Sequence, residues 1–221
     1  MILIGMFDSP FVRRVAVSLN FLSLPFEHRN WSVGRDFDAI RQYNPLGRVP
    51  TLVLADGEAL LESGAILDYL DEVAGPKRAL LPASGRARRD ALQLMAIATG
   101  AAEKGVLQIY ESAFRPEQKR HEPWLERCRM QMHAALSALD AHAKSRGGGW
   151  LVGDSLSQAD ITVACVSTFL NLAFRADPES SVYPALGALK DRCEATPEFR
   201  AVKPPVFAAP QPAARPASTG A

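Results

Sequence analysis

Residues 44–54 read NPLGRVPTLVL, and this stretch decides how the first part of the chain folds. Its first four residues favour a turn, and its last four are typical of a buried strand. Pro50 stands at the junction, and because proline lacks a backbone donor it is confined to strand starts, edges and bulges. We therefore expect a cis Val49–Pro50 bond, since only X–Pro bonds adopt cis at about 0.5–1 kcal/mol. Such a bond would turn the amide and carbonyl of Val49 outward at the mouth of the strand.

The residues on either side predict the element order β-α-β-α-β-β-α. Ser9 can cap the first helix, with Pro10 at its first position, where the missing N–H costs little. Asp56-Gly57 predicts the turn of a hairpin, and Gly75-Pro76 predicts the end of the third helix. The expected strands are residues 2–6, 25–29, 52–55 and 58–61, and the expected helices are residues 10–19, 36–43 and 63–73.

The chain beyond residue 85 is alanine-rich and helical, with expected helices at residues 86–114, 123–145 and 161–172 and a short last one from Thr196. Ser157 and Asp160 form a capping box in which Asp replaces the usual Glu or Gln, and we expect both to be structural. The predicted organisation is a domain at residues 1–75, a linker at 76–85, an all-helical domain at 86–203 and a Pro/Ala-rich tail at 204–221. The composition of the tail favours disorder or loose attachment.

Length, charge and composition narrow the class of protein. The chain has 221 residues, which is comfortable for two domains, and 48% of them are apolar, as in an ordinary globular protein. The formal net charge is +1, so no overall attraction to nucleic acid or to an anionic membrane is expected. No run of about 18 apolar residues occurs and the start lacks a basic leader, so neither a membrane span nor a signal peptide is expected.

The cysteines and histidines indicate neither disulfides nor metal chemistry. The three cysteines are odd in number and widely spaced, which predicts reduced thiols in a cytoplasmic protein. Cys165 lies in an apolar run and is interpreted as core packing. The four histidines are scattered without the spacing of metal ligands, so no metal site is expected.

Five short motifs occur in a recognisable order: Ser9 to Arg13, Asn44 to Pro50, Leu61 to Ser63, Leu80 to Pro82, and Ser157 to Asp160. Together they resemble the cytosolic glutathione S-transferase family over residues 1–203. The Ser-Pro-Phe motif is most similar to that of serine-type bacterial and plant members. The resemblance implies a thioredoxin-like α/β N-terminal domain followed by an all-α C-terminal domain. It also implies a homodimer, with glutathione as co-substrate and no metal or nucleotide.

The resemblance places the catalytic residue at Ser9. A free thiol of pKa about 8.5 is a poor nucleophile at neutral pH, and lowering that pKa by ~2 units requires about 2.7 kcal/mol in favour of the thiolate. The Ser9 hydroxyl can donate to the sulfur, and the helix that follows contributes positive partial charge. Position 9 matches the first cysteine of the glutaredoxin motif, and Val12 replaces the second, so disulfide exchange through a protein cysteine is not available here. Asp8 is a puzzle, because a neighbouring negative charge opposes a thiolate.

The same resemblance assigns the rest of the glutathione site. Val49, beside a cis Pro50, offers backbone hydrogen bonds to the cysteinyl part. Ser63 and nearby amides suit the γ-glutamyl carboxylate, because anions favour helix N-termini, and Glu62 suits the ammonium group. An ordinary Glu-Ser helix cap is the alternative for this pair. The remaining contacts are Phe11 and Arg48; Arg48 is placed at the glycyl carboxylate, with a solvated surface arginine as the alternative.

The electrophile is expected between the two domains, against apolar walls that confer loose selectivity. Gly105 lies near these walls, and ordinary core packing is the alternative for each of them. Arg13 and Arg14 are expected on a solvated or interdomain helix face. The predicted electrophile pocket is lined by Phe11, Val12, Gln108, Ile109 and Tyr110.

These residues predict an enzyme, a glutathione transferase that activates the bound thiol for attack on a small, apolar electrophile. One alternative is a non-catalytic binding or interaction module of the same fold. Another is a glutathione-dependent isomerase, dehalogenase or peroxidase. The serine-cysteine-rich loop of isomerase-type members is missing, and Met6 to Pro10 stand in its place.

Overall fold

The computed structural model describes residues 1–174 and 182–206, so most of the tail predicted at 204–221 lies outside the described residues. The first half of the chain has the predicted order of elements. Its strands and helices are β1 (Ile2–Ile4), α1 (Pro10–Phe21), β2 (Glu27–Arg29), α2 (Phe37–Arg41), β3 (Thr51–Val53), β4 (Ala59–Leu61) and α3 (Ser63–Ala74).

The second half is helical, as expected. Its elements are α4 (Gly85–Phe114), the short 3-10 helix η1 (Glu117–Lys119), α5 (Glu122–Ser145), α6 (Gln158–Ala173), α8 (Pro184–Glu194) and α9 (Pro197–Arg200). Helix α8 was not among the elements predicted from the sequence. Proline at its first helical position and buried Leu186, Leu189 and Cys193 at helical spacing were the signals available for it.

The four strands form one mixed sheet in the order β2-β1-β3-β4. β1 pairs in parallel with β2, whereas β1–β3 and β3–β4 are antiparallel. Successive side chains of a strand point to opposite faces. Leu3 and Leu52 therefore join the core formed with α1 and α3, while Ile4 and Val53 pack with Ile40 of α2 on the other face.

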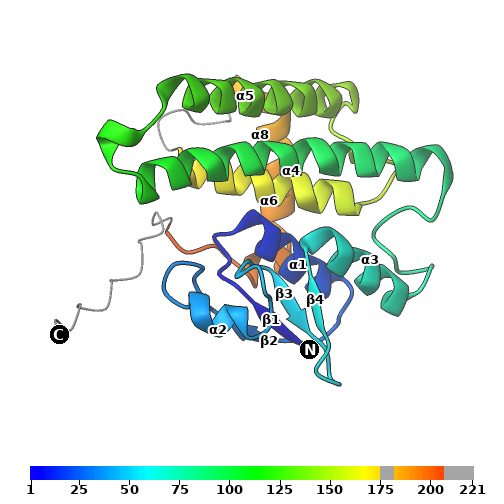
Figure 1. Cartoon of the computed structure of the whole chain (residues 1–221). Coiled ribbons are helices and arrows are strands. Elements are labelled where there is room, and N and C mark those ends of the chain that lie inside the picture. The colour runs from blue at the N-terminus through cyan, green and yellow to red at the C-terminus, as the bar shows by residue number, and fades with distance from the viewer. Residues whose placement is uncertain (175–181, 207–221) are drawn as a thin grey trace.

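Helices α1 and α3 lie between the sheet and the helical domain, and α4 and α5 run side by side at the far edge of the molecule (Figure 1). α6 contacts α4, α8 and α1, so it joins the two halves. The connection between the halves is also held in place, because the Asp71 carboxylate accepts hydrogen bonds from the amides of Leu80 and Leu81 at 2.8 and 3.0 Å.

α6 begins at the predicted capping box. The Asp160 carboxylate accepts from the amide of Ser157 at 2.9 Å and from its hydroxyl at 2.8 Å, and its other oxygen accepts from the amide of Leu151 at 2.8 Å. Asp160 is fully buried, so these bonds replace the water that the carboxylate loses. This arrangement accounts for an Asp at a position where Glu or Gln is usual.

Arg13 and Arg14 are both buried, so of the two faces predicted for them, solvated or interdomain, the structure has the interdomain one. Arg13 is 1% exposed and binds Glu194 of α8. Arg14 is 3% exposed and reaches α3 and α6. The helix is enclosed by both domains, and each arginine is buried together with a polar partner from another element, as burial of a charge requires.

Cys128, Cys165 and Cys193 are free and buried, and burial raises the pKa of the Cys165 thiol to about 12. Within residues 1–174 and 182–206, no helix has the length and apolar character to cross a membrane.

Candidate functional site

Three chain segments meet at one edge of the sheet, and the strand register brings them there. Ile4 is paired with Thr51, and Thr51 is paired with Leu61. The end of β1, the start of β3 and the end of β4 therefore stand in one row. The segments just beyond that row are 5–9, 48–50 and 62–63, which hold most of the residues predicted to bind glutathione.

Ser9 is the N-cap of α1. Its hydroxyl oxygen accepts a long hydrogen bond of 3.4 Å from the amide of Val12, and its own amide binds the carbonyl of Met6. Because the oxygen only accepts from the helix, the hydroxyl proton is available to a group outside it. Ser9 is partly exposed, so a ligand at the start of α1 can reach it.

The Val49–Pro50 bond is cis, as predicted. Neither the amide nor the carbonyl of Val49 bonds to another group within the part of the chain that the structure describes. Gly5 allows this segment to approach β1 closely, because a Cβ at Gly5 would lie 2.5 Å from Val12 Cγ2 and 2.8 Å from Val49 Cβ. The absence of a side chain at Gly5 therefore allows the start of α1 and the Val49–Pro50 turn to lie close together.

Glu62 and Ser63 start α3, and their side chains form a connected group with Arg14. Arg14 Nη2 donates to Ser63 Oγ at 2.7 Å, and Ser63 Oγ donates to Glu62 Oε1 at 3.2 Å. Glu62 Oε2 accepts from the amide of Gly64 at 3.0 Å. The Ser63 residue is fully buried, whereas Glu62 is exposed. Glu62 therefore caps α3, as an ordinary Glu-Ser cap would, and its role at the ammonium group stays a prediction.

A backbone amide and a neighbouring arginine favour the ionised form of the Glu62 carboxyl group. Burial alone would raise its pKa, but the hydrogen bond from the Gly64 amide and the charge of Arg14 lower the pKa below its ordinary value. Burial also lowers the pKa of Arg14 to about 10, which still leaves it charged at neutral pH. Sequence reasoning did not connect Arg14 with this site, because only the packing of α1 against α3 brings the two together.

Tyr110 of the long helix α4 lies within electrostatic range of Arg48 and Asp8, which belong to segments at this edge of the sheet. Burial raises the pKa of Tyr110, while the charge of Arg48 lowers it and that of Asp8 raises it, so all three groups are close enough to interact. Burial also raises the pKa of Asp8, against the effect of the backbone amides of Ser9 and of Asp8 itself. Arg48 is exposed.

The other predicted pocket walls lie in different surroundings. Phe11 is partly exposed at the start of α1, while Val12 and Ile109 are buried in the core, as the core-packing alternative had it. The Gln108 amide group donates to the carbonyl of Lys104 at 3.0 Å and to Met132 Sδ at 3.7 Å.

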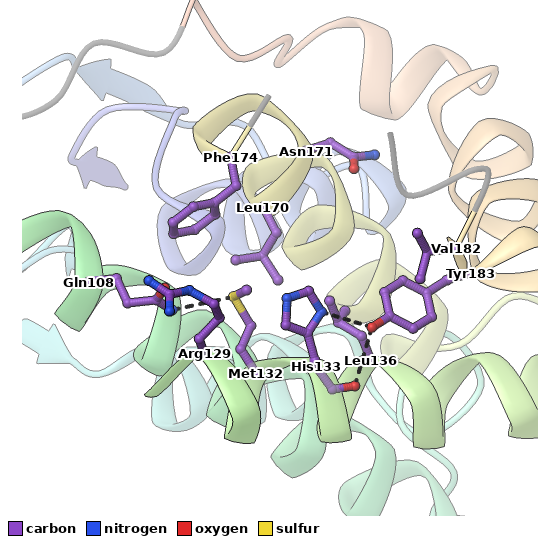
Figure 2. A pocket seen from close by; sticks show the side chains of 10 residues that line it. All are labelled: Gln108, Arg129, Met132, His133, Leu136, Leu170, Asn171, Phe174, Val182 and Tyr183. Carbon is purple, nitrogen blue, oxygen red and sulfur yellow. Dashed lines mark hydrogen bonds between the residues drawn. The ribbon is translucent and has the colours of Figure 1, made fainter. Parts of the chain in front are cut away.

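Gln108 also faces a cavity of about 210 Å³ inside the helical domain (Figure 2). Apolar Leu136, Leu170 and Phe174 form part of its lining, beside the hydrogen-bonded pair His133 and Tyr183. Of the predicted electrophile walls, the described residues that line this cavity include Gln108 alone. The lining contains no residue of the sheet or of α1, so the cavity is separate from the sheet edge. No cluster of three or more metal-ligating side chains occurs among the described residues.

Comparison with known families identifies both halves of the chain. Residues 3–78 match the glutathione S-transferase N-terminal domain, and residues 122–192 match the glutathione S-transferase C-terminal domain. The chain belongs to the glutathione S-transferase family. The predicted fold, a thioredoxin-like domain followed by an all-helical domain, is thereby confirmed.

Individual relatives cover almost the whole chain. The uncharacterized GST-like protein YibF of Escherichia coli K12 is 29% identical over 203 residues, which are 92% of this chain and 98% of YibF. A glutathione S-transferase from Methylobacterium radiotolerans, crystallised with glutathione sulfonate, has a TM-score of 0.85 at 29% identity and covers 100% of this chain and 98% of its own. A family member from Pseudomonas fluorescens with bound glutathione has a TM-score of 0.81 at 32% identity and covers 93% and 99%.

Proposed function

We propose that this protein is a glutathione transferase that activates the thiol of bound glutathione through Ser9 for attack on a small, apolar electrophile. The observation that carries the proposal is the meeting of Ser9, Val49 and Glu62 at one edge of the sheet, which follows from the pairing of Ile4 with Thr51 and of Thr51 with Leu61. Relatives of the same fold bind glutathione or its sulfonate.

The chemistry follows from the atoms at this edge. The Ser9 hydroxyl would donate to the sulfur, and the N-terminus of α1 would contribute positive partial charge, so that the thiolate is favoured over the thiol. The amide and carbonyl of Val49, which have no partner among the described residues, would bind the cysteinyl backbone. Tyr110 of α4, which is close enough to Arg48 and Asp8 for their charges to act on it, would form one wall for the electrophile.

The test combines calorimetry with a panel of electrophiles that includes an aryl chloride and an organic hydroperoxide. We expect the protein to bind glutathione and to transfer it. Ser9→Ala should lower kcat by about 100-fold, which is typical for loss of one donor to a developing anion. Ser137→Ala, on the exposed face of α5, is the matched control. The proposal fails if glutathione does not bind, or if Ser9→Ala transfers at the rate of the control.

A glutathione-dependent isomerase is the second candidate. It is favoured by relatives such as a probable maleylacetoacetate isomerase 2 of Drosophila melanogaster, which is 26% identical over 86% of this chain and 82% of its own. The segment Met6 to Pro10 contains a single serine and no cysteine, which speaks against it. Catalysis of the cis–trans isomerisation of maleylacetoacetate, with no net consumption of glutathione, would favour the isomerase over the transferase.

A further inference from the structure

We propose that Arg14, buried in α1, is a positioning residue that holds the Glu62 carboxylate, through Ser63, in the orientation that accepts the ammonium group of a γ-glutamyl ligand. The inference rests on the proposed function, because it assigns a specificity role within the same glutathione site. Arg14 itself would not touch the ligand.

Hydrogen bonds are donated in one direction along this group, from Arg14 to Ser63 and from Ser63 to Glu62. Arg14 can only donate, and its Nη2 lies 2.7 Å from Ser63 Oγ. Since Ser63 Oγ accepts there, its single proton is free to point to Glu62 Oε1, 3.2 Å away. Ser63 is thereby fixed as an acceptor on one side and a donor on the other. Without Arg14, its hydroxyl could rotate and leave Glu62 with one hydrogen bond fewer.

The burial of Arg14 needs a reason beyond the packing of the two domains. The guanidinium is 3% exposed, yet its Nε has no partner among the described residues, and its contact with Thr162 is a long one of 3.5 Å. Among the carboxylates, Glu62 is the one whose charge supports the ionised form of Arg14. A buried cation with an unsatisfied donor is costly, which is expected where the charge serves a site.

The Glu62 backbone supports the same assignment. Its φ of 68° lies in the left-handed region that is uncommon for residues other than glycine. The side chain is fixed at both oxygens, by Ser63 Oγ and by the amide of Gly64. Glu62 nevertheless remains exposed, so the carboxylate is held from behind while its outer face is open to a cationic group of a ligand.

The test compares two peptides that differ only in the ammonium group: glutathione and N-glutaryl-cysteinyl-glycine. Calorimetry measures both affinities for the wild type, Arg14→Met, Ser63→Ala and Arg89→Met. The last variant removes an exposed arginine of α4 and is the matched control for loss of one positive charge.

We expect the wild type to prefer glutathione and Arg14→Met to reduce this preference by about tenfold, the size of one hydrogen bond to a charged group. Ser63→Ala should reduce it in the same direction, and Arg89→Met should leave it unchanged. If Arg14→Met does not fold, Ser63→Ala decides, because it breaks the same chain of contacts and keeps the buried charge. An equal loss of affinity for both peptides, or a preference that does not change, overturns the positioning role. Wild-type protein that binds neither peptide instead refutes the proposed function.

Discussion

Removal of either partner of the buried ion pair between Arg13 and Glu194 should destabilise the whole chain. Arg13 Nη1 and Nη2 donate to the two Glu194 oxygens at 2.5 and 2.7 Å, and Arg13 Nε donates to the carbonyl of Val202 at 3.0 Å. The Arg13 side chain is 1% exposed and that of Glu194 is 26% exposed. The pair joins α1, which Ser9 caps, to the end of α8.

The expected loss in the free energy of unfolding depends on which of the two charges remains without its partner. Glu194→Gln leaves the Arg13 cation buried with mainly carbonyl oxygens as partners, and we expect a loss of about 4 kcal/mol in the free energy of unfolding. Arg13→Met leaves a carboxylate that water can partly solvate and that still accepts from Thr168, so a smaller loss of about 3 kcal/mol is expected. The double variant Arg13→Met/Glu194→Met removes both charges and should lie within about 2 kcal/mol of the wild type, because apolar groups of similar volume can replace a buried pair.

Urea unfolding followed by tryptophan fluorescence and circular dichroism measures these differences. The pH gives a second readout. Burial alone would raise the pKa of Glu194, but the hydrogen bonds from Arg13 and Thr168 and the Arg13 charge lower it below its ordinary 4.5. A lowered pKa in the folded state means that this stabilisation is complete above pH 4.5 and is lost as the pH falls through the folded value. Additive single losses in the double variant, or a loss under about 1 kcal/mol for Glu194→Gln, would refute the reasoning.

Two further predictions concern folding alone. Asp160→Asn should lower the free energy of unfolding by about 2–3 kcal/mol, because a buried carboxylate with three hydrogen bonds is replaced by a group that can accept at one atom only. Thermal unfolding measures this loss, and Asp154→Asn at an exposed position is the control. Equal melting temperatures of the two variants would contradict the prediction. Gly105→Ala should cost about 1–3 kcal/mol, since its Cβ would lie 2.6 Å from Leu170 Cδ2. A Cβ at Gly100 in the same helix meets nothing within 4 Å, so Gly100→Ala should instead stabilise the protein by up to about 1 kcal/mol. If Gly105→Ala were the more stable of the two variants, packing of α4 against α6 would not determine the effect of these substitutions.

Local chemistry explains which parts of the fold could be predicted. The cis bond before Pro50, the helix start at Ser9 and the capping box at Asp160 each depend on residues close together in the sequence. Helix α8 was not assigned, although Pro184 and its apolar spacing pointed to a helix. Its apolar positions are few, and burial against α5 and α6 stabilises it, which no local pattern reveals.

The arginines of α1 show the opposite case. A neighbouring pair of arginines is typical of a solvated face, and nothing within α1 indicates that Arg13 is paired with a residue 181 positions away. The same holds for Arg14, whose partner Ser63 belongs to another helix. Both contacts arise only because α1 is enclosed by α3 on one side and by α6 and α9 on another.

The sequence by itself determined the family, the order of the first seven elements and the turns that place Ser9, Val49 and Glu62, because caps, prolines and glycines act within a few residues of themselves. Only the tertiary structure decided that Arg14 of α1 binds Ser63 beside Glu62 and that Tyr110 of α4 lies within range of the charges of Arg48 and Asp8. The reason is physical: a charge is buried or exposed according to what packs around it, and the groups that surround these side chains come from distant parts of the chain.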